Sequence, residues 1–332
     1  MAHQVHRLRG CVITASKEMG MSQADVLQPS VFEYPKGQLH LEYTLSNGQM
    51  FRWRKTDDGW WDAVTGSRML RIRQVPGATD GLDRFEFFTY PQPDDEAFMR
   101  TFLRLDVELP PLYESWKEAD PYLGGLGVRF MGLRLVLQRP EECLLSFMCS
   151  TANFIPRIMK AIALIARDHG EPITDPSGKV WTHAFPSAAV IAELDPNALA
   201  EKTGLEWRAG NLVKVARQVA SRPEGWLDEL AALDFATARG ELMRLEGVGP
   251  KIADCVCLFA MSKDQAVPVD THVWQLTRDR YLPSLRGKSL TPTAYGQVLQ
   301  FFQSRFQKAG WAQQYLFYDH LLESRAKRGN RS

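Results

Sequence analysis

The spacing of hydrophobic and polar residues changes once along the chain, near Asp94. Between about residues 31 and 90, β-branched and aromatic residues alternate or cluster in short runs, separated by turn sequences such as SNGQ, TDDGW and VTGS. Such runs between turn residues are typical of strands. The pattern predicts an antiparallel meander of roughly five strands, with runs at residues 38–45, 49–55, 68–75 and 84–90.

Beyond Asp94 the apolar residues recur at the three- and four-residue spacing of helices. Acidic residues mark the first helix start, at Asp94 and Asp95, and Pro or Gly stands at many later boundaries. The expected helices cover residues 94–105, 139–150, 153–170, 185–194, 195–204, 207–220, 235–245, 250–261, 270–281, 291–310 and 311–325. Many are short, and together they predict a compact all-helical domain.

The two patterns together predict an α+β protein with a small N-terminal antiparallel β domain and a larger helical domain. We expect a flexible extension at residues 1–29 and the β domain, with a connecting helix, at 30–105. The helical domain then covers 106–324, and a basic tail follows at 325–332.

Composition limits the possible functions without choosing one. The 332 residues include 40 basic and 39 acidic side chains, so bulk charge gives no argument for a nucleic-acid partner. The five cysteines are an odd number without a Cys-x2-Cys pair, which indicates a reducing, intracellular location and argues against a metal or iron–sulfur site. No apolar run has the length of a membrane span. We expect neither a metal nor a cofactor, and any DNA-binding site must depend on local geometry.

The stretch LMRLEGVGPKIADCVCLFA, residues 242–260, has a short glycine-containing gap between two helical patterns. Gly247 and Gly249 permit positive φ and a close approach to the backbone, and Pro250 suits a first helical turn. This predicts a helix-hairpin-helix at 235–262, whose exposed N–H groups could hold a DNA phosphate without a basic side chain. A glycine turn between helices is also a plain connection in many unrelated proteins, so the hairpin alone leaves both interpretations open.

Two side chains add candidate chemistry to this hairpin. Lys251 stands at a helix start, where the helix dipole disfavours a cation, so we expect an amine of depressed pKa that can act as a nucleophile. Asp270 follows an extended segment and precedes a helix, which predicts an N-cap. The helix after Lys251 spans roughly 18 Å and the extended segment returns a comparable distance, so Asp270 can come back beside Lys251. Asp270 alone would be a plain cap, whereas the pair favours catalysis.

The run LEGVGPKIADCVCLFAMSKDQAVPVDTHVW resembles the hairpin and Gly/Pro/Asp segment of the helix-hairpin-helix DNA glycosylase superfamily, in particular its 8-oxoguanine DNA glycosylase branch. Other segments resemble the family in the expected order along the chain: SNGQMFRWR, FLRLDVELPPLYESW, LSFMCSTANFIPRI, GLEWRAGNLV and AGWAQQYLF. The resemblance covers about residues 30–320. It implies a TBP-like β domain packed on a helical HhH-GPD domain with DNA bound between them, and an enzyme that flips 8-oxoguanine out of duplex DNA and excises it.

The resemblance also implies roles for individual residues. Lys251 matches the nucleophile that forms a Schiff base and permits β-elimination, which makes the enzyme an AP lyase, and Asp270 matches the carboxylate that stabilises charge on the sugar. Gly48 matches the glycine whose carbonyl accepts from N7–H of 8-oxoguanine. The other matches are Gln313 for the Watson–Crick edge, Phe317 and Cys255 for the two faces of the base, and Gly247, Gly249 and His272 for DNA phosphates. Taken singly, each of these residues also fits an ordinary turn, core or surface role.

The chain departs from the family pattern where the flipped base leaves a gap. The family has a run of asparagines there, whereas this chain has Ala152 followed by Asn153. Arg157 and Arg208 match the pair that reads the estranged cytosine, and Trp207 replaces the neighbouring wedge tyrosine. The resemblance therefore implies that the lesion chemistry is retained, and it leaves selectivity for the opposite base open.

Two other functions compete with this interpretation: a helix-hairpin-helix glycosylase for alkylated or other damaged bases, and a noncatalytic helix-hairpin-helix DNA-binding protein. A glycosylase for alkylated bases typically keeps the aspartate and lacks the lysine, so Lys251 argues against it. A noncatalytic DNA-binding module would need neither the Lys251–Asp270 pair nor a base pocket. We expect a monomer that binds duplex DNA containing 8-oxoguanine opposite cytosine, in the nucleus of a eukaryote or at the nucleoid in the cytoplasm of a bacterium.

Overall fold

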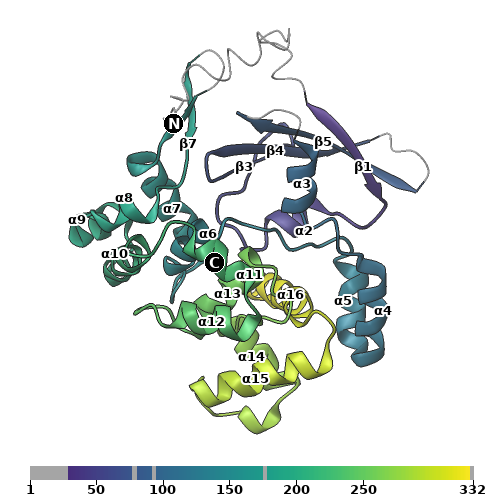
Figure 1. The fold of residues 1–332 in the computed structure, drawn as a ribbon. Coiled ribbons are helices and arrows are strands. Elements are labelled where there is room, and N and C mark those ends of the chain that lie inside the picture. Colours follow the sequence, from purple (N-terminus) through teal and green to yellow (C-terminus); the bar gives the residue numbers. More distant parts are fainter. Residues whose placement is uncertain (1–28, 77–80, 92–94, 175–177, 330–332) are drawn as a thin grey trace.

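The computed structural model describes residues 29–76, 81–91, 95–174 and 178–329. The predicted N-terminal extension, the helix start at Asp94 and the end of the basic tail lie wholly or partly outside these ranges. A sheet forms the N-terminal region, and helices form most of the rest (Figure 1).

The N-terminal sheet has five strands in the order β1-β5-β4-β3-β2 (Figure 1). These are β1 (Ser30–Pro35), β2 (Arg54–Lys55), β3 (Trp61–Thr65), β4 (Arg68–Val75) and β5 (Leu82–Tyr90). The predicted antiparallel β domain is confirmed, because every pairing in the sheet is antiparallel. Only β2 to β5 follow one another as a meander, since β1 pairs with β5.

The run at 38–45 is not a strand, although it was predicted as one. It contains a short helix, α2 (Leu41–Leu45). Leu41 and Leu45 are buried four positions apart, and the His40 ring caps the helix by accepting a hydrogen bond from a first-turn N–H. A helix of 5 residues is too short to show its own period against the alternating residues beside it.

The run at 49–55 contributes only the two residues of β2 to the sheet. The side chain of Gln49 is buried and donates to the carbonyl oxygens of Thr44 and Arg134, at 2.7 and 2.8 Å. These bonds hold the start of the run against the interior instead of in the sheet. Strand β3 was not predicted, because its last residues fall in the sequence VTGS, which indicates a turn.

One face of the sheet packs against α2 and α3 (Glu96–Phe102). Phe85 and Phe87 of β5 are fully buried in this cluster together with Met99 of α3. The helix start follows from the sequence, since Asp95 caps α3 by accepting from the backbone N–H of Phe98 at 2.9 Å.

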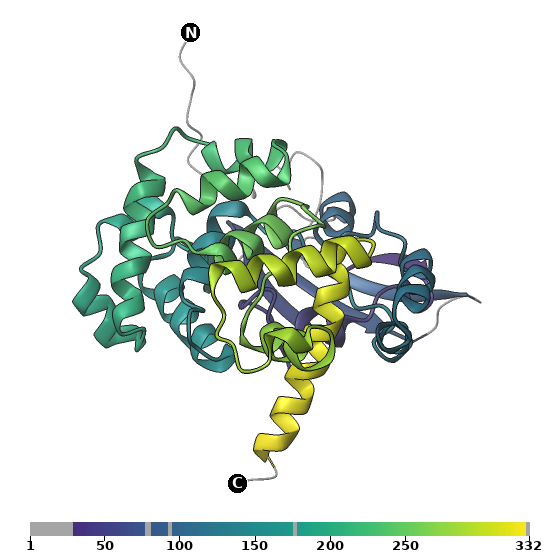
Figure 2. The same ribbon diagram turned by 90° about the horizontal axis from the view of Figure 1, so that it is seen from below.

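The helical region contains all the later helices that the sequence predicted. They are α6 (Pro140–Met148), α7 (Ile155–His169), α8 (Ala188–Ala192), α9 (Pro196–Thr203), α10 (Trp207–Ala220), α12 (Phe235–Met243), α13 (Pro250–Ala260), α14 (Thr271–Arg280), α15 (Pro292–Arg305) and α16 (Ala309–Gly329). Figure 2 shows the last turns of α16 projecting beyond the other helices. None of the helices in the described ranges has the length and apolar character that a membrane crossing requires.

Some elements of this region were not predicted. They are the helices α4 (Leu109–Ala119), α5 (Pro121–Arg129) and α11 (Trp226–Ala232), a 3-10 turn at Pro283–Leu285, and the strands β6 (Pro172–Thr174) and β7 (Val180–His183). The two strands pair antiparallel in a sheet of their own. The region is therefore mostly helical and not wholly so.

Helix α13 lies in the core of the helical region. All its residues from Ile252 to Ala260 are buried, and it packs against α6 and α12. The buried Asp254 accepts hydrogen bonds from Arg239 of α12 at 2.6 Å and from Tyr295 of α15 at 2.5 Å. The two helices of the hairpin are thus joined by an ion pair.

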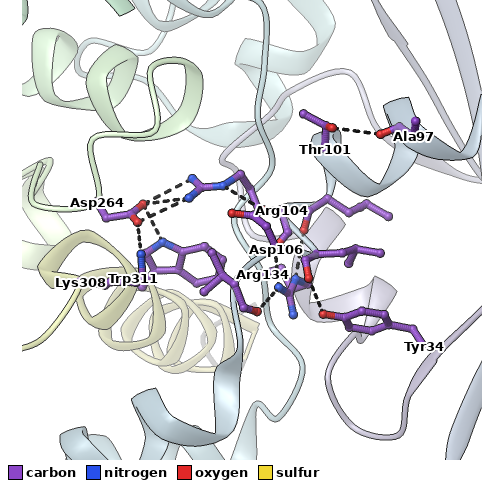
Figure 3. A network of polar contacts seen from close by, with 12 residues as sticks. Tyr34, Ala97, Thr101, Arg104, Asp106, Arg134, Asp264, Lys308 and Trp311 are labelled. Carbon is purple, nitrogen blue, oxygen red and sulfur yellow. Dashed lines mark hydrogen bonds and ion pairs between the residues drawn. The ribbon is translucent and has the colours of Figure 1, made fainter. Parts of the chain in front are cut away.

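A polar network fixes the chain after α13 against the start of α16 (Figure 3). Asp264 accepts hydrogen bonds from Lys308 at 2.5 Å and Trp311 at 2.9 Å, and it forms an ion pair with Arg104 at 3.4 Å. Beside it, the fully buried Arg134 donates to backbone carbonyls of the segment that follows α3. The network joins segments far apart in sequence, and it sets α16 relative to α13.

Candidate active site

A cavity of about 460 Å³ is lined by the turn after α2 and by residues at or near α6, α7, α13, α14 and α16. Eight of the predicted site residues line this one cavity: Gly48, Asn153, Lys251, Cys255, Asp270, His272, Gln313 and Phe317. They come from distant parts of the chain, and the fold brings them together.

Lys251 lies in the first turn of α13 with its side chain half-buried. Its Nζ donates a hydrogen bond to Ser150 Oγ at 2.8 Å and lies 4.8 Å from the centre of the Phe147 ring. No acidic side chain in the described ranges forms an ion pair with this amine. A hydroxyl and an aromatic face therefore position the lysine, and Ser150 is a residue that the sequence did not reveal.

Asp270 is the N-cap of α14, as the sequence predicted. Its Oδ1 accepts a hydrogen bond from the backbone N–H of Val273 at 2.8 Å. No other donor within the described residues bonds to the carboxylate, which is half-buried on the cavity wall. One oxygen holds the helix start, and the other is available to a ligand in the cavity.

One wall of the cavity carries buried side-chain groups without a hydrogen-bond partner in the described residues, and another wall carries a glycine. Gln313 is buried, and its Oε1 has no hydrogen-bond partner within the described part of the chain; the same holds for Nε2 of Gln314. Gly48 has a φ of +81°, a conformation that favours glycine, and it places its backbone on the lining. Buried polar groups are almost always hydrogen-bonded in stable proteins, so this cavity suits a ligand with several N–H and C=O groups.

Cys255 and Phe317 give the cavity its apolar surface. Cys255 is almost fully buried, and burial raises the pKa of its thiol to about 12 although the nearby Lys251 acts in the opposite direction. The thiol is therefore neutral and packs as a small apolar group. The half-buried Phe317 ring contacts His272 edge-on, with 5.6 Å between the ring centres.

His272 pairs with a second histidine that the sequence did not reveal. The Nδ1 atoms of His272 and His320 lie 3.0 Å apart. A hydrogen bond between two ring nitrogens needs a proton on one of them and none on the other. His320, from α16, therefore orients the His272 ring beside the N-cap of α14.

The hairpin has the geometry expected of an anion site. Gly247 has a φ of +107°, which favours glycine, and Gly249 is the N-cap of α13 without a side-chain capping bond. Both are exposed, and a Cβ at Gly249 would meet nothing within 4 Å. The backbone N–H groups at this helix start are open to a phosphate from outside.

The remaining candidates form a second cluster, at the starts of α7 and α10. Arg208 is buried and donates to the carbonyl oxygens of Thr151 and Ala152, the latter at 2.6 Å. Its guanidinium lies 4.8 Å from the centre of the Trp207 ring, which is 54% exposed. The structure thus brings together Ala152 of the predicted gap segment, Trp207 at the predicted wedge position and Arg208.

Arg157 belongs to the same cluster. Its Nη2 donates to the carbonyl oxygen of Gly204 and to Glu206 Oε1, each at 2.5 Å. Glu206 also lies 3.5 Å from Arg208 Nη1, so that one carboxylate contacts both arginines. The sequence did not single out Glu206.

The predicted gap segment, Ala152 and Asn153, is held by hydrogen bonds to nearby residues. Ala152 has a φ of +47°, and the Asn153 amide donates to the Cys149 carbonyl at 3.1 Å and accepts from the N–H of Phe154 at 3.0 Å. Asn153 therefore stabilises the turn. Phe154, which the sequence did not single out, is 55% exposed on the rim of the cavity.

An antiparallel β domain joined to a helical domain, with a glycine hairpin whose lysine lines the same cavity as a capping aspartate, is the arrangement typical of a helix-hairpin-helix DNA glycosylase. The sequence-family model of the 8-oxoguanine DNA glycosylase N-terminal domain matches residues 31–144 of this chain. The chain is 33% identical to the N-glycosylase/DNA lyase OGG1 of Arabidopsis thaliana over 86% of this chain and 78% of that protein. It therefore belongs to the 8-oxoguanine DNA glycosylase family of N-glycosylase/DNA lyases.

Two further comparisons agree with this membership. The N-glycosylase/DNA lyase of Saccharomyces cerevisiae is 29% identical over 85% of this chain and 83% of its own length. The 8-oxoguanine glycosylase/lyase of Clostridium acetobutylicum, solved in complex with dsDNA containing cytosine opposite 8-oxoG, has a TM-score of 0.76 at 25% identity. That match covers 90% of this chain and 97% of the other.

Proposed function

We propose that this cavity receives an 8-oxoguanine nucleotide flipped out of duplex DNA and that Lys251 performs the chemistry. The observation that carries the proposal is the single cavity lined by Lys251, Asp270 and the unpartnered Gln313 Oε1. As a neutral amine, Nζ attacks C1′ of the deoxyribose while the glycosidic bond breaks and its electron pair leaves with the base. The Asp270 carboxylate stabilises the positive charge that develops on the sugar.

The bond formed between Nζ and C1′ leads to a Schiff base once the sugar ring opens. Loss of a C2′ proton then expels the 3′ phosphate by β-elimination, which is the lyase step. Ser150 holds the amine in place before the attack, because its hydroxyl accepts the Nζ hydrogen bond.

Recognition of the lesion is assigned to groups on the cavity wall. The carbonyl of Gly48 accepts from N7–H of 8-oxoguanine, a hydrogen that guanine lacks, and Gln313 bonds the Watson–Crick edge. A buried carbonyl left unpaired by guanine would discriminate by about 1–3 kcal/mol. The Phe317 ring and the Cys255 thiol contact the faces of the base.

The DNA is a duplex with cytosine opposite the lesion, bound by a monomer. Gly247 and Gly249 at the start of α13, together with His272, hold phosphates of the lesion strand. Arg157 and Arg208 donate to the estranged cytosine, while Trp207 and Phe154 supply apolar surface at the gap. We place the protein inside the cell, with genomic DNA as its substrate.

Covalent capture tests the proposal. With duplex containing 8-oxoguanine opposite cytosine, borohydride should trap the enzyme on DNA, and Lys251→Gln should abolish trapping while duplex binding persists. Lys214→Gln, which removes an exposed lysine that pairs with Glu246, is the matched control and should trap like the wild type. Trapping by the Lys251 variant at the wild-type level would place the nucleophile elsewhere.

The same assay separates the alternatives. A glycosylase without a lysine nucleophile would release the base and leave no adduct. A noncatalytic binding module would leave the lesion intact in the DNA. Guanine in place of 8-oxoguanine should give neither base release nor adduct.

A further inference from the structure

Glu206 lies between the two arginines of the second cluster. Its Oε1 is 2.5 Å from Arg157 Nη2, and its Oε2 is 3.5 Å from Arg208 Nη1. The Glu206 side chain is 58% exposed, whereas that of Arg208 is 5% exposed. Hydrogen bonding to Arg157 lowers the pKa of Glu206, so the group is a carboxylate at neutral pH.

The backbone does not account for a glutamate at this position. Glu206 has φ +57° and ψ −137°, a region that favours glycine. It is the N-cap residue of α10, but its side chain makes no capping hydrogen bond. Within the described structure, the polar contacts of its carboxylate are with Arg157 and Arg208 alone.

The cluster presents a pattern of donors and acceptors to its surroundings. Nε and Nη1 of Arg157 have no hydrogen-bond partner among the described residues, and Nη1 of Arg208 makes only long contacts, of 3.3 and 3.5 Å. The carboxylate of Glu206 is the acceptor beside these donors. The Watson–Crick edge of cytosine has the complementary set, one amine donor at N4 and two acceptors at N3 and O2.

We propose that Glu206 accepts a hydrogen bond from the N4 amine of the estranged cytosine while Arg157 and Arg208 donate to N3 and O2. The inference rests on the proposed function, in which the two arginines read the opposite base. A glutamate that accepts from the cytosine amine is a known mode of base recognition. Thymine has an oxygen at position 4, which the carboxylate repels, so Glu206 selects cytosine over thymine.

Removing the amine from the base and the carboxylate from the protein tests this pairing. The DNA carries 8-oxoguanine opposite either cytosine or pyrimidin-2-one, which keeps N3 and O2 but lacks the amine. We expect wild-type protein to bind the pyrimidin-2-one duplex about tenfold more weakly than the cytosine duplex. Glu206→Gly, whose glycine suits the backbone conformation, should bind both duplexes equally, and its preference for cytosine over thymine should fall by a similar factor.

Two further variants test whether the change in base preference comes from the Glu206 carboxylate itself. Glu206→Gln keeps the size of the side chain and removes the charge, so it should tolerate thymine better than the wild type. Glu246→Gln removes a carboxylate from the hairpin, where it pairs with Lys214, and should change binding to all duplexes by the same factor.

The outcomes that contradict the inference differ from those that contradict the proposed function. One contradicting outcome is that wild type and Glu206→Gly lose the same factor of affinity when pyrimidin-2-one replaces cytosine. Another is that Glu206→Gly binds the cytosine duplex more tightly than the wild type does. Either result would make Glu206 a counter-ion that DNA displaces from the arginines. In both cases 8-oxoguanine would still be excised and trapped through Lys251. Absence of excision in the wild type would instead contradict the proposed function.

Discussion

At the scale of single residues, Ala152 affects both the backbone conformation and the proposed recognition of the opposite base. Its φ of +47° lies in the left-handed region, where alanine is disfavoured and asparagine is better tolerated. Its carbonyl is an acceptor for Arg208, one of the two proposed readers of the opposite base. A change at this position should therefore affect both the stability of the turn and the proposed gap beside the flipped nucleotide.

Ala152→Asn should raise the free energy of unfolding by about 0.5–1 kcal/mol, because asparagine suits the left-handed conformation. It should also raise excision opposite cytosine and widen the preference over adenine, since the amide adds a polar group at the gap. Urea unfolding measures the first effect, and single-turnover excision opposite the two bases measures the second. Ala236→Asn, at an exposed position of α12, is the control and should leave the ratio unchanged. An unchanged ratio for Ala152→Asn as well would mean that Phe154 or Trp207 already fills the gap.

Some residues of the site could be predicted from the sequence and others could not. Lys251 and Asp270 stand at helix starts, so local rules and the family resemblance both identify them. Ser150 acts on Lys251 from 101 residues away, and His320 acts on His272 across 48 residues. Such pairs arise only from tertiary contact, which no local pattern encodes.

At the scale of elements, two helix N-termini position the proposed catalytic residues. The N-terminus of α13 carries Lys251 and the open backbone N–H groups, and the N-terminus of α14 carries Asp270. Asp270 therefore has a structural and a proposed electrostatic role, and these can be separated because asparagine caps a helix about as well as aspartate.

Asp270→Asn should change the free energy of unfolding by no more than about 0.5 kcal/mol. Base excision should fall by about a hundredfold or more, because the charge that stabilises the sugar cation is lost. The comparison is Asp195→Asn, which alters the N-cap of α9 in the same way and should leave excision unchanged. Thermal unfolding and single-turnover excision measure the two effects, and near-wild-type excision by the Asp270 variant would reduce that residue to a cap.

The helices differ in how well the sequence predicted them. Helix α10 has the predicted bounds, since its apolar residues recur at helical spacing over 14 residues. Helices α4 and α5 were missed, because their prolines and glycines are typical of loops. In α5 these glycines have a packing role: a Cβ at Gly124 would lie 2.6 Å from the backbone of Lys117 in α4, so glycine permits the close approach of the two helices. Composition alone does not distinguish such contacts from a loop.

At the scale of the whole molecule, the network around Asp264 fixes α16 relative to α13. Burial alone would raise the pKa of Asp264, but the charges of Arg104 and Lys308 outweigh it and the pKa lies below its usual value. A carboxyl with a lower pKa in the folded state contributes stability that is complete above the unfolded value, about 3.9, and is lost as the pH falls through the folded value.

Asp264→Asn should therefore lower the free energy of unfolding by about 3 kcal/mol at pH 7, because Arg104 and Lys308 lose the carboxylate that both of them contact. The difference from the wild type should narrow as the pH falls below about 4. Urea unfolding of both proteins at pH 7 and at pH 3 measures this difference in the free energy of unfolding. Asp228→Asn, at an exposed position, is the control. The same difference at both pH values would mean that neutral hydrogen bonds, and not charge, hold the network.

The cavity is lined by residues whose positions range from Gly48 to Arg325, so its walls come from nearly the full described length of the chain. During synthesis the turn that carries Gly48 emerges early, and Lys251 emerges well before Gln313 and Phe317. A nascent chain that already carries the proposed nucleophile still lacks the wall that is proposed to recognise the lesion. A protein truncated before α16 should therefore be unable to select a damaged base, because Gln313 and Phe317 are missing from its cavity.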